Sequence, residues 1–173
     1  ACGTGGLTIP LSAMGYQMTG VDLSEEMLFE ASQKARRAGA MIPFIKQDMR
    51  ALRLHRRMDA VLCTCDGINY LPSPDDVLTF FYAAGNALRP GGALVFDLST
   101  PYKLKSVLGN NFIGDETADI AYLWKNVYDP RSESVRMDLS VFIRQQEEVY
   151  QRISERQVQY AYPFETLEEL LTR

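Results

Sequence analysis

Two glycines and a carboxylate near the start of the chain have the types and spacing of a nucleoside-binding site. Gly3 and Gly5 form a G-x-G turn, and Asp22 follows Gly5 by 17 residues. A loop without Cβ atoms lets the backbone approach a ligand closely, and the helix after it offers unpaired N–H groups. An acid roughly 20 residues later, at the tip of the next strand, suits two ribose hydroxyls. The spacing therefore predicts a ribose-bearing ligand, and a plain turn at Gly3 and Gly5 is the alternative.

The residues after these glycines disfavour a dinucleotide. The dinucleotide fingerprint G-x-G-x-x-G would place its third glycine at position 8, where the sequence has Thr8. A nicotinamide-dependent oxidoreductase is therefore the weaker alternative among enzymes.

Five short blocks, read together, resemble a known family. They are Ala1-Cys2-Gly3-Thr4-Gly5, residues 19–28, Gln47-Asp48-Met49, residues 66–71 and residues 88–92. In order and spacing they resemble class I S-adenosylmethionine-dependent methyltransferases over residues 1–98. The resemblance implies S-adenosylmethionine as the cofactor and methyl transfer as the reaction. A binding module that holds the cofactor without transfer is the alternative outside the enzymes.

The resemblance also implies which residues hold the cofactor. Asp22 should bind the ribose, and Asp48 should accept a hydrogen bond from the adenine amino group. For Asp48 a capping role is the alternative, and for Met27 it is core packing. The expected cofactor-binding residues are Ala1, Cys2, Gly3, Gly5, Asp22, Leu23, Met27, Asp48, Met49, Thr64 and Cys65.

The stretch after the predicted strand at residues 58–65 should lie near the reacting atoms, because open α/β sheets bind ligands at the carboxyl ends of their strands. The sulfonium makes the methyl group electrophilic, so the protein mainly positions two reactants. Asp66 and Tyr70 are the candidate catalytic residues, and Asn69 is a candidate substrate contact. Asp66 could accept a proton from the nucleophile, and Tyr70 could attract the sulfonium through its ring. A strand-end aspartate that binds loop amides is the equally weighted alternative for Asp66.

Charge and motif absences favour a small-molecule acceptor. The chain of 173 residues has a net charge of −4, which argues against a nucleic-acid partner. Asp66-Gly67-Ile68-Asn69 stands where amino-methylating nucleic-acid enzymes carry an Asn/Asp-Pro-Pro-aromatic motif. No apolar run approaches the roughly 20 residues of a membrane span, so no membrane partner is expected.

The three cysteines favour a reducing compartment, and a cytoplasmic location is expected. Cys63 and Cys65 form C-x-C on one predicted strand and should share one face. No metal site is expected from them or from the single histidine.

The elements that must position these residues alternate between strand and helix, which predicts an α/β fold. We expect a doubly wound, mostly parallel Rossmann-like sheet with helices on both faces, and buried strands where the sequence is continuously apolar. The first and last core strands of the family are not found in the sequence, so a chain incomplete at both ends is expected. Expected helices cover residues 7–14, 24–38, 75–88, 101–108 and 163–173, and expected strands cover 17–21, 42–46, 58–65 and 93–98.

An antiparallel insertion is predicted after this core. Three strand-like runs cover residues 120–128, 135–144 and 149–160. The predicted domains are the cofactor-binding core (1–100), the insertion (101–162) and a returning core helix (163–173). We expect the insertion to cover the acceptor site, with Tyr122, Trp124, Arg156 and Tyr160 as acceptor contacts. Packing against a second subunit of a homodimer is the alternative.

Overall fold

The computed structural model describes all 173 residues, which divide into two compact units. The first unit comprises residues 1–68, 74–98 and 170–173. The second comprises residues 69–73 and 99–169. No helix is long and apolar enough to cross a membrane. The predicted functional boundaries at residues 100 and 162 stay a prediction.

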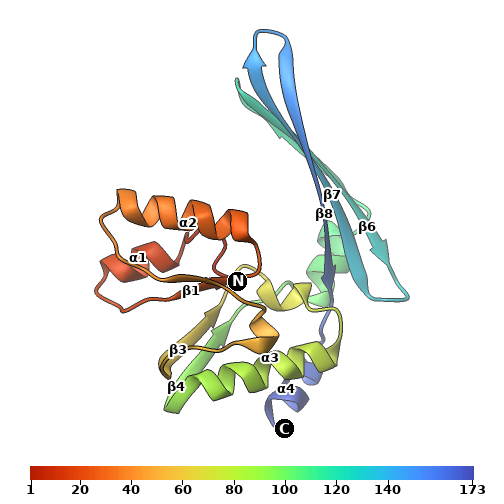
Figure 1. The fold of residues 1–173 in the computed structure, drawn as a ribbon. Helices are drawn as coiled ribbons and strands as arrows, with labels where there is room; N and C mark the ends of the chain where they lie inside the picture. Colours follow the sequence, from red (N-terminus) through yellow and green to blue (C-terminus); the bar gives the residue numbers. More distant parts are fainter. The chain divides into compact units, whose positions relative to one another are not determined.

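The first unit alternates helices and strands (Figure 1). Its two parallel strand pairs, β1–β2 and β3–β4, confirm the α/β class. Its elements are α1 (Thr8–Ala13), β1 (Gly20–Asp22), α2 (Glu25–Arg37), β2 (Phe44–Lys46), the 3₁₀ helix η1 (Met49–Ala51), β3 (Met58–Cys63), α3 (Pro74–Ala87) and β4 (Leu88–Phe96).

The two pairs share no ladder of hydrogen bonds and form separate two-stranded sheets. The first residues of the chain lie alongside both pairs instead. The backbone N–H of Cys2 donates to the carbonyl of Val21 in β1 across 2.9 Å. Ala1 lies beside Gly67, just after β3, where a Cβ on that glycine would be 3.2 Å from the Ala1 Cβ. The glycine loop is therefore held between the ends of both strand pairs.

Helix α2 forms as its sequence predicts. The hydroxyl of Ser24 accepts a hydrogen bond from the backbone N–H of Met27 across 3.2 Å and caps the helix. Leu28, Ala31 and Ala35 form one buried stripe, with the three- and four-residue spacing of a helix face. This stripe packs on β1 and β2 and so fixes the glycine loop over the strand ends.

Helix α3 covers one face of β3 and β4, and its Phe81 ring packs 5.7 Å from the ring of Phe96. The expectation that these strands are buried on both faces is wrong. Leu62 is 37% exposed and Val95 is 52% exposed, because no helix of the structure covers their side of the pair. Residues 89–92, which separate the expected helix at 75–88 from the expected strand at 93–98, lie within β4, where Gly91 adopts a φ of +79°.

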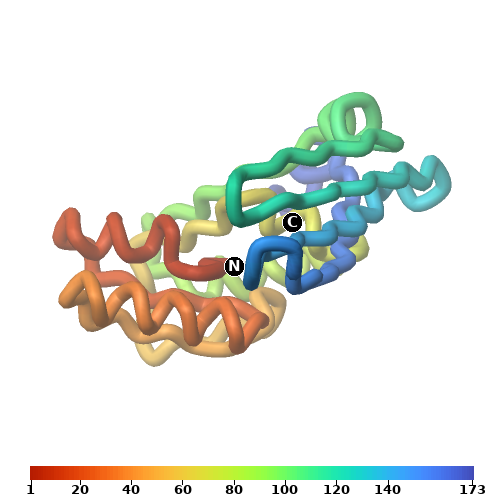
Figure 2. The backbone as a smooth tube through the Cα atoms, turned by 90° about the horizontal axis from the view of Figure 1, so that it is seen from above, coloured from red at the N-terminus to blue at the C-terminus, as the bar shows by residue number.

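The second unit is built on an antiparallel sheet in the order β5-β6-β7-β8 (Figure 2). The expected three-stranded insertion is therefore corrected to four strands, because the short edge strand β5 was not predicted. The elements are the π-helix η3 (Lys103–Leu108), β5 (Phe112–Glu116), β6 (Ile120–Asp129), β7 (Ser134–Gln146), β8 (Val149–Tyr160) and α4 (Phe164–Leu171). A short 3₁₀ helix, η2 (Gly67–Tyr70), joins the two units in sequence.

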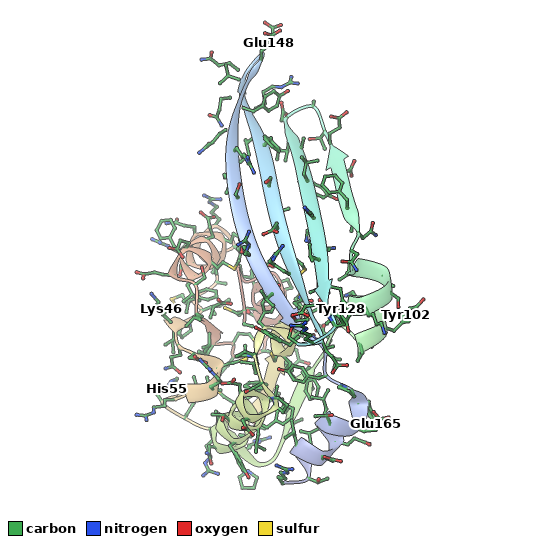
Figure 3. All side chains as sticks on the ribbon, turned by 90° about the vertical axis from the view of Figure 1, so that its right-hand side faces the viewer. Lys46, His55, Tyr102, Tyr128, Glu148 and Glu165 are labelled. Atoms are coloured by element: carbon green, nitrogen blue, oxygen red, sulfur yellow. The ribbon has the colours of Figure 1, made fainter.

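The strand register gives the sheet two different faces. Residues directly opposite in an antiparallel pair share a face, and Trp124 pairs with Leu139 while Tyr128 pairs with Val135. This apolar face packs on the buried Leu104 of η3. Arg136 and Asp138 lie on the opposite, charged face. In Figure 3, Tyr102, just before η3, and Tyr128 mark one end of the sheet and Glu148 marks the other.

Candidate active site

Asp22 ties the glycine loop to the end of β1. One oxygen of its carboxylate accepts from the backbone N–H of Gly3 across 2.7 Å, and the other accepts from Ser24 across 3.0 Å. A carboxylate has about four acceptor positions, so two stay available for ribose hydroxyls. The G-x-G turn is therefore built around the carboxylate that was predicted to bind ribose.

Glycine is required at both turn positions. Gly3 and Gly5 adopt φ values of +52° and +77°, which side chains with a Cβ rarely tolerate. A Cβ on Gly5 would also lie 3.3 Å from the Cβ of Ala31. Gly5 therefore lets α2 approach the loop closely.

Two large apolar side chains beside the loop are exposed. Leu23 is 65% exposed and Met27 is 40% exposed. The Met27 sulfur would lie 3.7 Å from a Cβ on Gly3, so this side chain lies along the loop. Because Met27 is this exposed, the alternative prediction that it packs in the core is wrong. Such an apolar rim fits a ligand with an adenosine group, which would cover it.

Asp48 follows β2 and is held by Arg50. The carboxylate accepts from the backbone N–H of Arg50 across 2.9 Å and from the guanidinium across 2.6–3.1 Å. The hydrogen bonds from the Arg50 side chain lower the pKa of Asp48. Arg50 also pairs with Asp76 in the first turn of α3 across 2.5 Å. Asp48 therefore does cap the 3₁₀ helix η1, as the alternative role predicted. Its hydrogen bond to adenine stays a prediction.

The chain makes a strained turn directly after β3. Cys65 and Asp66 adopt φ values of +59° and +60°, in the left-handed region. Such backbone conformations in non-glycine residues concentrate at functional sites. The Asp66 backbone N–H donates to the carboxylate of Asp97 across 2.7 Å and so fixes the turn. Because β3 ends at Cys63, the expectation that Cys63 and Cys65 share one strand face is wrong: Cys63 is buried and Cys65 is exposed.

Gly67, which was not among the predicted site residues, is where three predicted segments meet. A Cβ on Gly67 would lie 2.7 Å from the Cys63 sulfur, 3.2 Å from the Ala1 Cβ and 4.0 Å from Met49 Cε. The glycine loop, the Asp48-Met49 segment and the turn after β3 therefore converge at one end of the first unit. A glycine directly after a strand-end aspartate was the available signal.

The half-buried Cys2 and the buried Cys63 are unsuited to nucleophilic catalysis. Burial raises the pKa of both Cys2 and Cys63, so their thiols stay protonated near neutral pH. The structure contains no group of three His, Cys, Asp or Glu side chains placed to hold a metal ion.

The candidate residues of the second unit do not form one group. Asn69 is fully buried, and its side chain bonds the backbone of Ser99 and Tyr160 across 2.8–3.0 Å. The Tyr70 hydroxyl donates to Gln157 across 2.9 Å.

The four predicted acceptor contacts lie on opposite faces of the antiparallel sheet. Tyr122 and Trp124 lie on its apolar face, whereas Arg156 and Tyr160 pair with residues of the charged face. One face of the sheet can therefore present only two of the four, and their contact with an acceptor stays a prediction.

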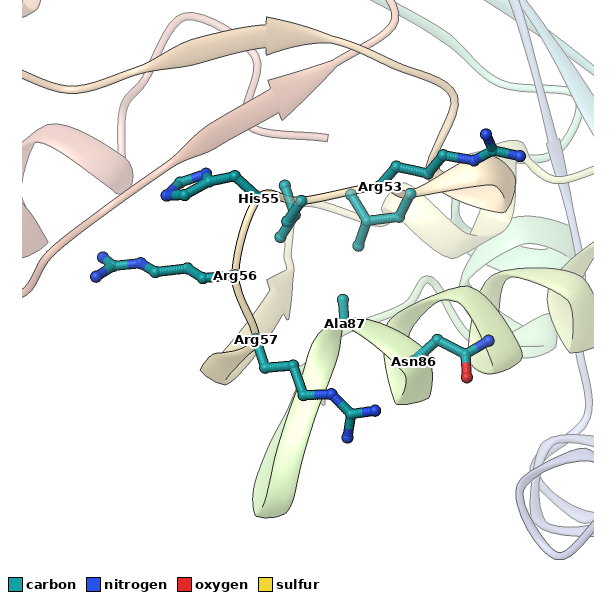
Figure 4. A pocket seen from close by; sticks show the side chains of 8 residues that line it. Arg53, His55, Arg56, Arg57, Asn86 and Ala87 are labelled. Carbon is teal, nitrogen blue, oxygen red and sulfur yellow. The ribbon is translucent and has the colours of Figure 1, made fainter.

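A cavity of about 370 Å³ lies before β3, at the opposite end of that strand from the strained turn. Its lining includes Arg53, His55, Arg56 and Arg57, and His55 and Arg56 point to one side while Arg53 and Arg57 point away from them (Figure 4). They do not converge on a single group, and none is a predicted cofactor residue.

The residues at the converging end fit S-adenosylmethionine. They supply a glycine loop that a ligand can approach closely, a carboxylate at Asp22 with acceptor positions left, as a ribose would need, and a second carboxylate at Asp48. An exposed apolar rim borders the loop. The turn carrying Cys65 and Asp66 lies at the same end and can place polar groups near the reacting methyl.

Comparison with known proteins agrees with this reading. Residues 1–92 match the family described as "Methyltransferase domain". The chain is 37% identical over 172 residues to YqeM of Bacillus subtilis (strain 168), a protein named as a methyltransferase, covering 99% of this chain and 69% of YqeM.

Solved structures show the same fold. An S-adenosylmethionine-dependent methyltransferase from Clostridium acetobutylicum ATCC 824 has a TM-score of 0.91 and 37% identity, covering 99% of this chain and 69% of that one. The sugar N-methyltransferase KedS8 from Streptoalloteichus sp ATCC 53650 has a TM-score of 0.82 and 23% identity, covering 99% and 68%. The cofactor is accordingly S-adenosylmethionine, and the chain belongs to the class I S-adenosylmethionine-dependent methyltransferases.

Proposed function

We propose that the protein methylates a small-molecule acceptor by direct in-line transfer. The observation that carries the proposal is the convergence at Gly67. It brings the cofactor loop within van der Waals distance of the turn that holds Asp66. The bound cofactor supplies an electrophilic methyl group, and the residues of this chain orient the two reactants.

Asp66 is the proposed proton acceptor. Its backbone is fixed by Asp97, so its position relative to the cofactor loop is set before the acceptor binds. An oxygen or nitrogen nucleophile loses a proton on methylation, and a carboxylate at this position can take it. Tyr70 is the second candidate, through its ring.

A small acceptor is supported by three features. The chain is acidic overall, with a net charge of −4. The Asp66-Gly67-Ile68-Asn69 segment replaces the motif of nucleic-acid amino-methylating enzymes. KedS8, which shares the fold, is by its name a sugar N-methyltransferase. An amine or hydroxyl of a small polar molecule is therefore the proposed target.

The antiparallel sheet is proposed to cover the acceptor with its apolar face. Trp124 Nε1 is buried there without a hydrogen-bond partner, and Tyr122 lines a cavity of about 370 Å³. On the other face, Arg156 is already paired with Asp138 across 2.5 Å. We therefore favour Tyr122 and Trp124 over Arg156 and Tyr160 as acceptor contacts, with packing on a second subunit as the competing role for the sheet.

The test is a transfer assay with defined acceptors. The protein is incubated with S-adenosylmethionine and a panel of small amines, amino sugars, phenols and catechols, and products are followed by mass spectrometry. We expect methylated product from at least one class, and Asp66→Asn should lower kcat more than cofactor affinity. Binding of cofactor without transfer to any member, but with transfer to RNA or protein, would refute the proposal.

A further inference from the structure

Arg50 is the most highly bonded side chain near the cofactor end of the first unit. Three donors of Arg50 contact the Asp48 carboxylate: the backbone N–H at 2.9 Å, one terminal guanidinium nitrogen at 2.6 Å, and Nε, whose single N–H is shared by both oxygens at 3.1 Å. About one of the four acceptor positions of this carboxylate therefore stays available. The same guanidinium reaches Asp76 across 2.5 Å. It therefore bridges the segment after β2 to the start of α3.

We propose that Arg50 is a positioning residue, which orients the Asp48 carboxylate so that it accepts a hydrogen bond from the adenine amino group and thereby selects adenine. The inference rests on the proposed role of Asp48. The planar fork of a guanidinium fixes a carboxylate in its own plane, which a single ammonium cannot do. Asp48 caps the three-residue 3₁₀ helix η1 through the backbone N–H of Arg50, and every other printed contact of its carboxylate comes from the Arg50 guanidinium.

Asp76 completes the arrangement. It holds the other end of the guanidinium, so Arg50 cannot rotate away from Asp48 without losing a second charge-assisted hydrogen bond. The Asp76 side chain is 23% exposed and that of Asp48 is 31% exposed, so solvent screens both pairs only in part. Arg50 lowers the pKa of Asp48 and so keeps its carboxylate ionised, which is the form that accepts hydrogen bonds.

The experiment compares two ligands that differ only at the purine. S-adenosylhomocysteine carries the 6-amino group, whereas S-inosylhomocysteine carries an oxygen there, which a carboxylate repels. Calorimetry at pH 7 gives both affinities for the wild type and for Arg50→Ala, Arg50→Lys, Asp76→Asn and Asp48→Asn. Arg57→Ala is the matched control, because Arg57 is exposed and forms no ion pair.

Arg50→Ala should weaken S-adenosylhomocysteine binding by about tenfold, the value of one charge-assisted hydrogen bond. It should affect S-inosylhomocysteine much less, so the ratio of the two affinities falls. Arg50→Lys should keep the charge and still lose the ratio, and Asp76→Asn should shift the ratio in the same direction. Thermal unfolding with saturating ligand identifies any variant that fails to fold.

Three results separate the possible failures. An unchanged ratio in Asp48→Asn would refute the adenine role of Asp48 and this inference with it, while methyl transfer by the protein would still stand. A changed ratio in Asp48→Asn, together with a wild-type ratio in Arg50→Ala, would refute only the positioning role. A loss of equal size for both ligands in Arg50→Ala would likewise show a purely structural contribution.

Discussion

Asp97, the residue after β4, accepts a hydrogen bond from the backbone N–H of Asp66 across 2.7 Å and so joins two neighbouring strand ends. The bond fixes a turn in which two consecutive non-glycine residues have positive φ. Because left-handed conformations cost roughly 1 kcal/mol per residue, the turn needs such an anchor.

Asp97→Ala should therefore loosen the turn at Asp66. We expect a loss of up to about 1 kcal/mol in the free energy of unfolding and a lower kcat. Asp97→Asn keeps an oxygen acceptor and should retain most of both. Urea denaturation and transfer assays check this, and equal behaviour of the two variants would contradict the anchoring role.

Asp22→Ala should weaken cofactor binding. The variant loses charge-assisted hydrogen bonds to the ribose, an effect on the order of 1.5–3 kcal/mol. It also frees the Gly3 and Ser24 amides, so unfolding must be measured alongside calorimetry. An affinity equal to that of the wild type would disprove the ribose assignment.

Gly67→Ala should disturb the point where the three segments meet. A Cβ there would lie 2.7 Å from the Cys63 sulfur, closer than packed atoms allow, so we expect a loss of about 1–3 kcal/mol in stability. Adding Cys63→Ala removes the sulfur and should recover part of the loss. Gly85→Ala in α3 is the control, because no atom lies within 4 Å and helix propensity predicts a gain of up to about 1 kcal/mol.

The pH dependence of stability should contain a contribution from Asp48. Arg50 lowers the pKa of Asp48 in the folded state, with Asp76 as the other charged group facing the pair. A lowered folded-state pKa stabilises the protein above the unfolded-state pKa of about 3.9, and the gain is lost as the pH falls through the folded-state pKa. The stability difference between wild type and Asp48→Asn should thus be constant above about pH 5 and shrink below it. Acid titration of urea unfolding measures it, and a constant difference down to pH 2.5 would contradict the linkage.

The protein should not bind nucleic acid. Fluorescence anisotropy with single-stranded RNA and duplex DNA at about 150 mM salt should give no saturable binding. The loop with Arg53, Arg56 and Arg57 is the basic cluster chosen for the test, because its three arginines follow one another closely and line one cavity. Micromolar, salt-sensitive binding that disappears when these three are changed to Ser would overturn the prediction.

Local signals predicted most of the elements. The capping residue Ser24 and the apolar stripe of α2 predict that helix. The alternation of side chains between two faces predicts the three long strands of the second unit. Strand β5 was not predicted, because Phe112–Glu116 contains a glycine and two acids, which have low strand propensity. It is a strand because β6 offers a hydrogen-bonding edge.

Pairwise relationships were harder to predict than elements. Whether Trp124 and Arg156 share a face depends on the register of two hairpins, which no single strand encodes. The left-handed turn at Cys65 and Asp66 has no glycine to mark it. Nothing in the sequence marked Arg50, since an arginine two residues after an aspartate is common in loops. Its second partner, Asp76, is distant in sequence and comes close only in the folded chain.

The long hairpin of β7 and β8 has an uneven distribution of burial along its length. Its strands have 13 and 12 residues, but the first eight positions of β8 are exposed and burial begins only near Gln159. Opening free energy follows local burial, so the amide hydrogens near Glu148 should exchange with deuterium far sooner than those beside Val135. We therefore expect the hairpin to open from its tip while its base stays folded. The tip should then be the segment of this sheet that a protease cuts most readily.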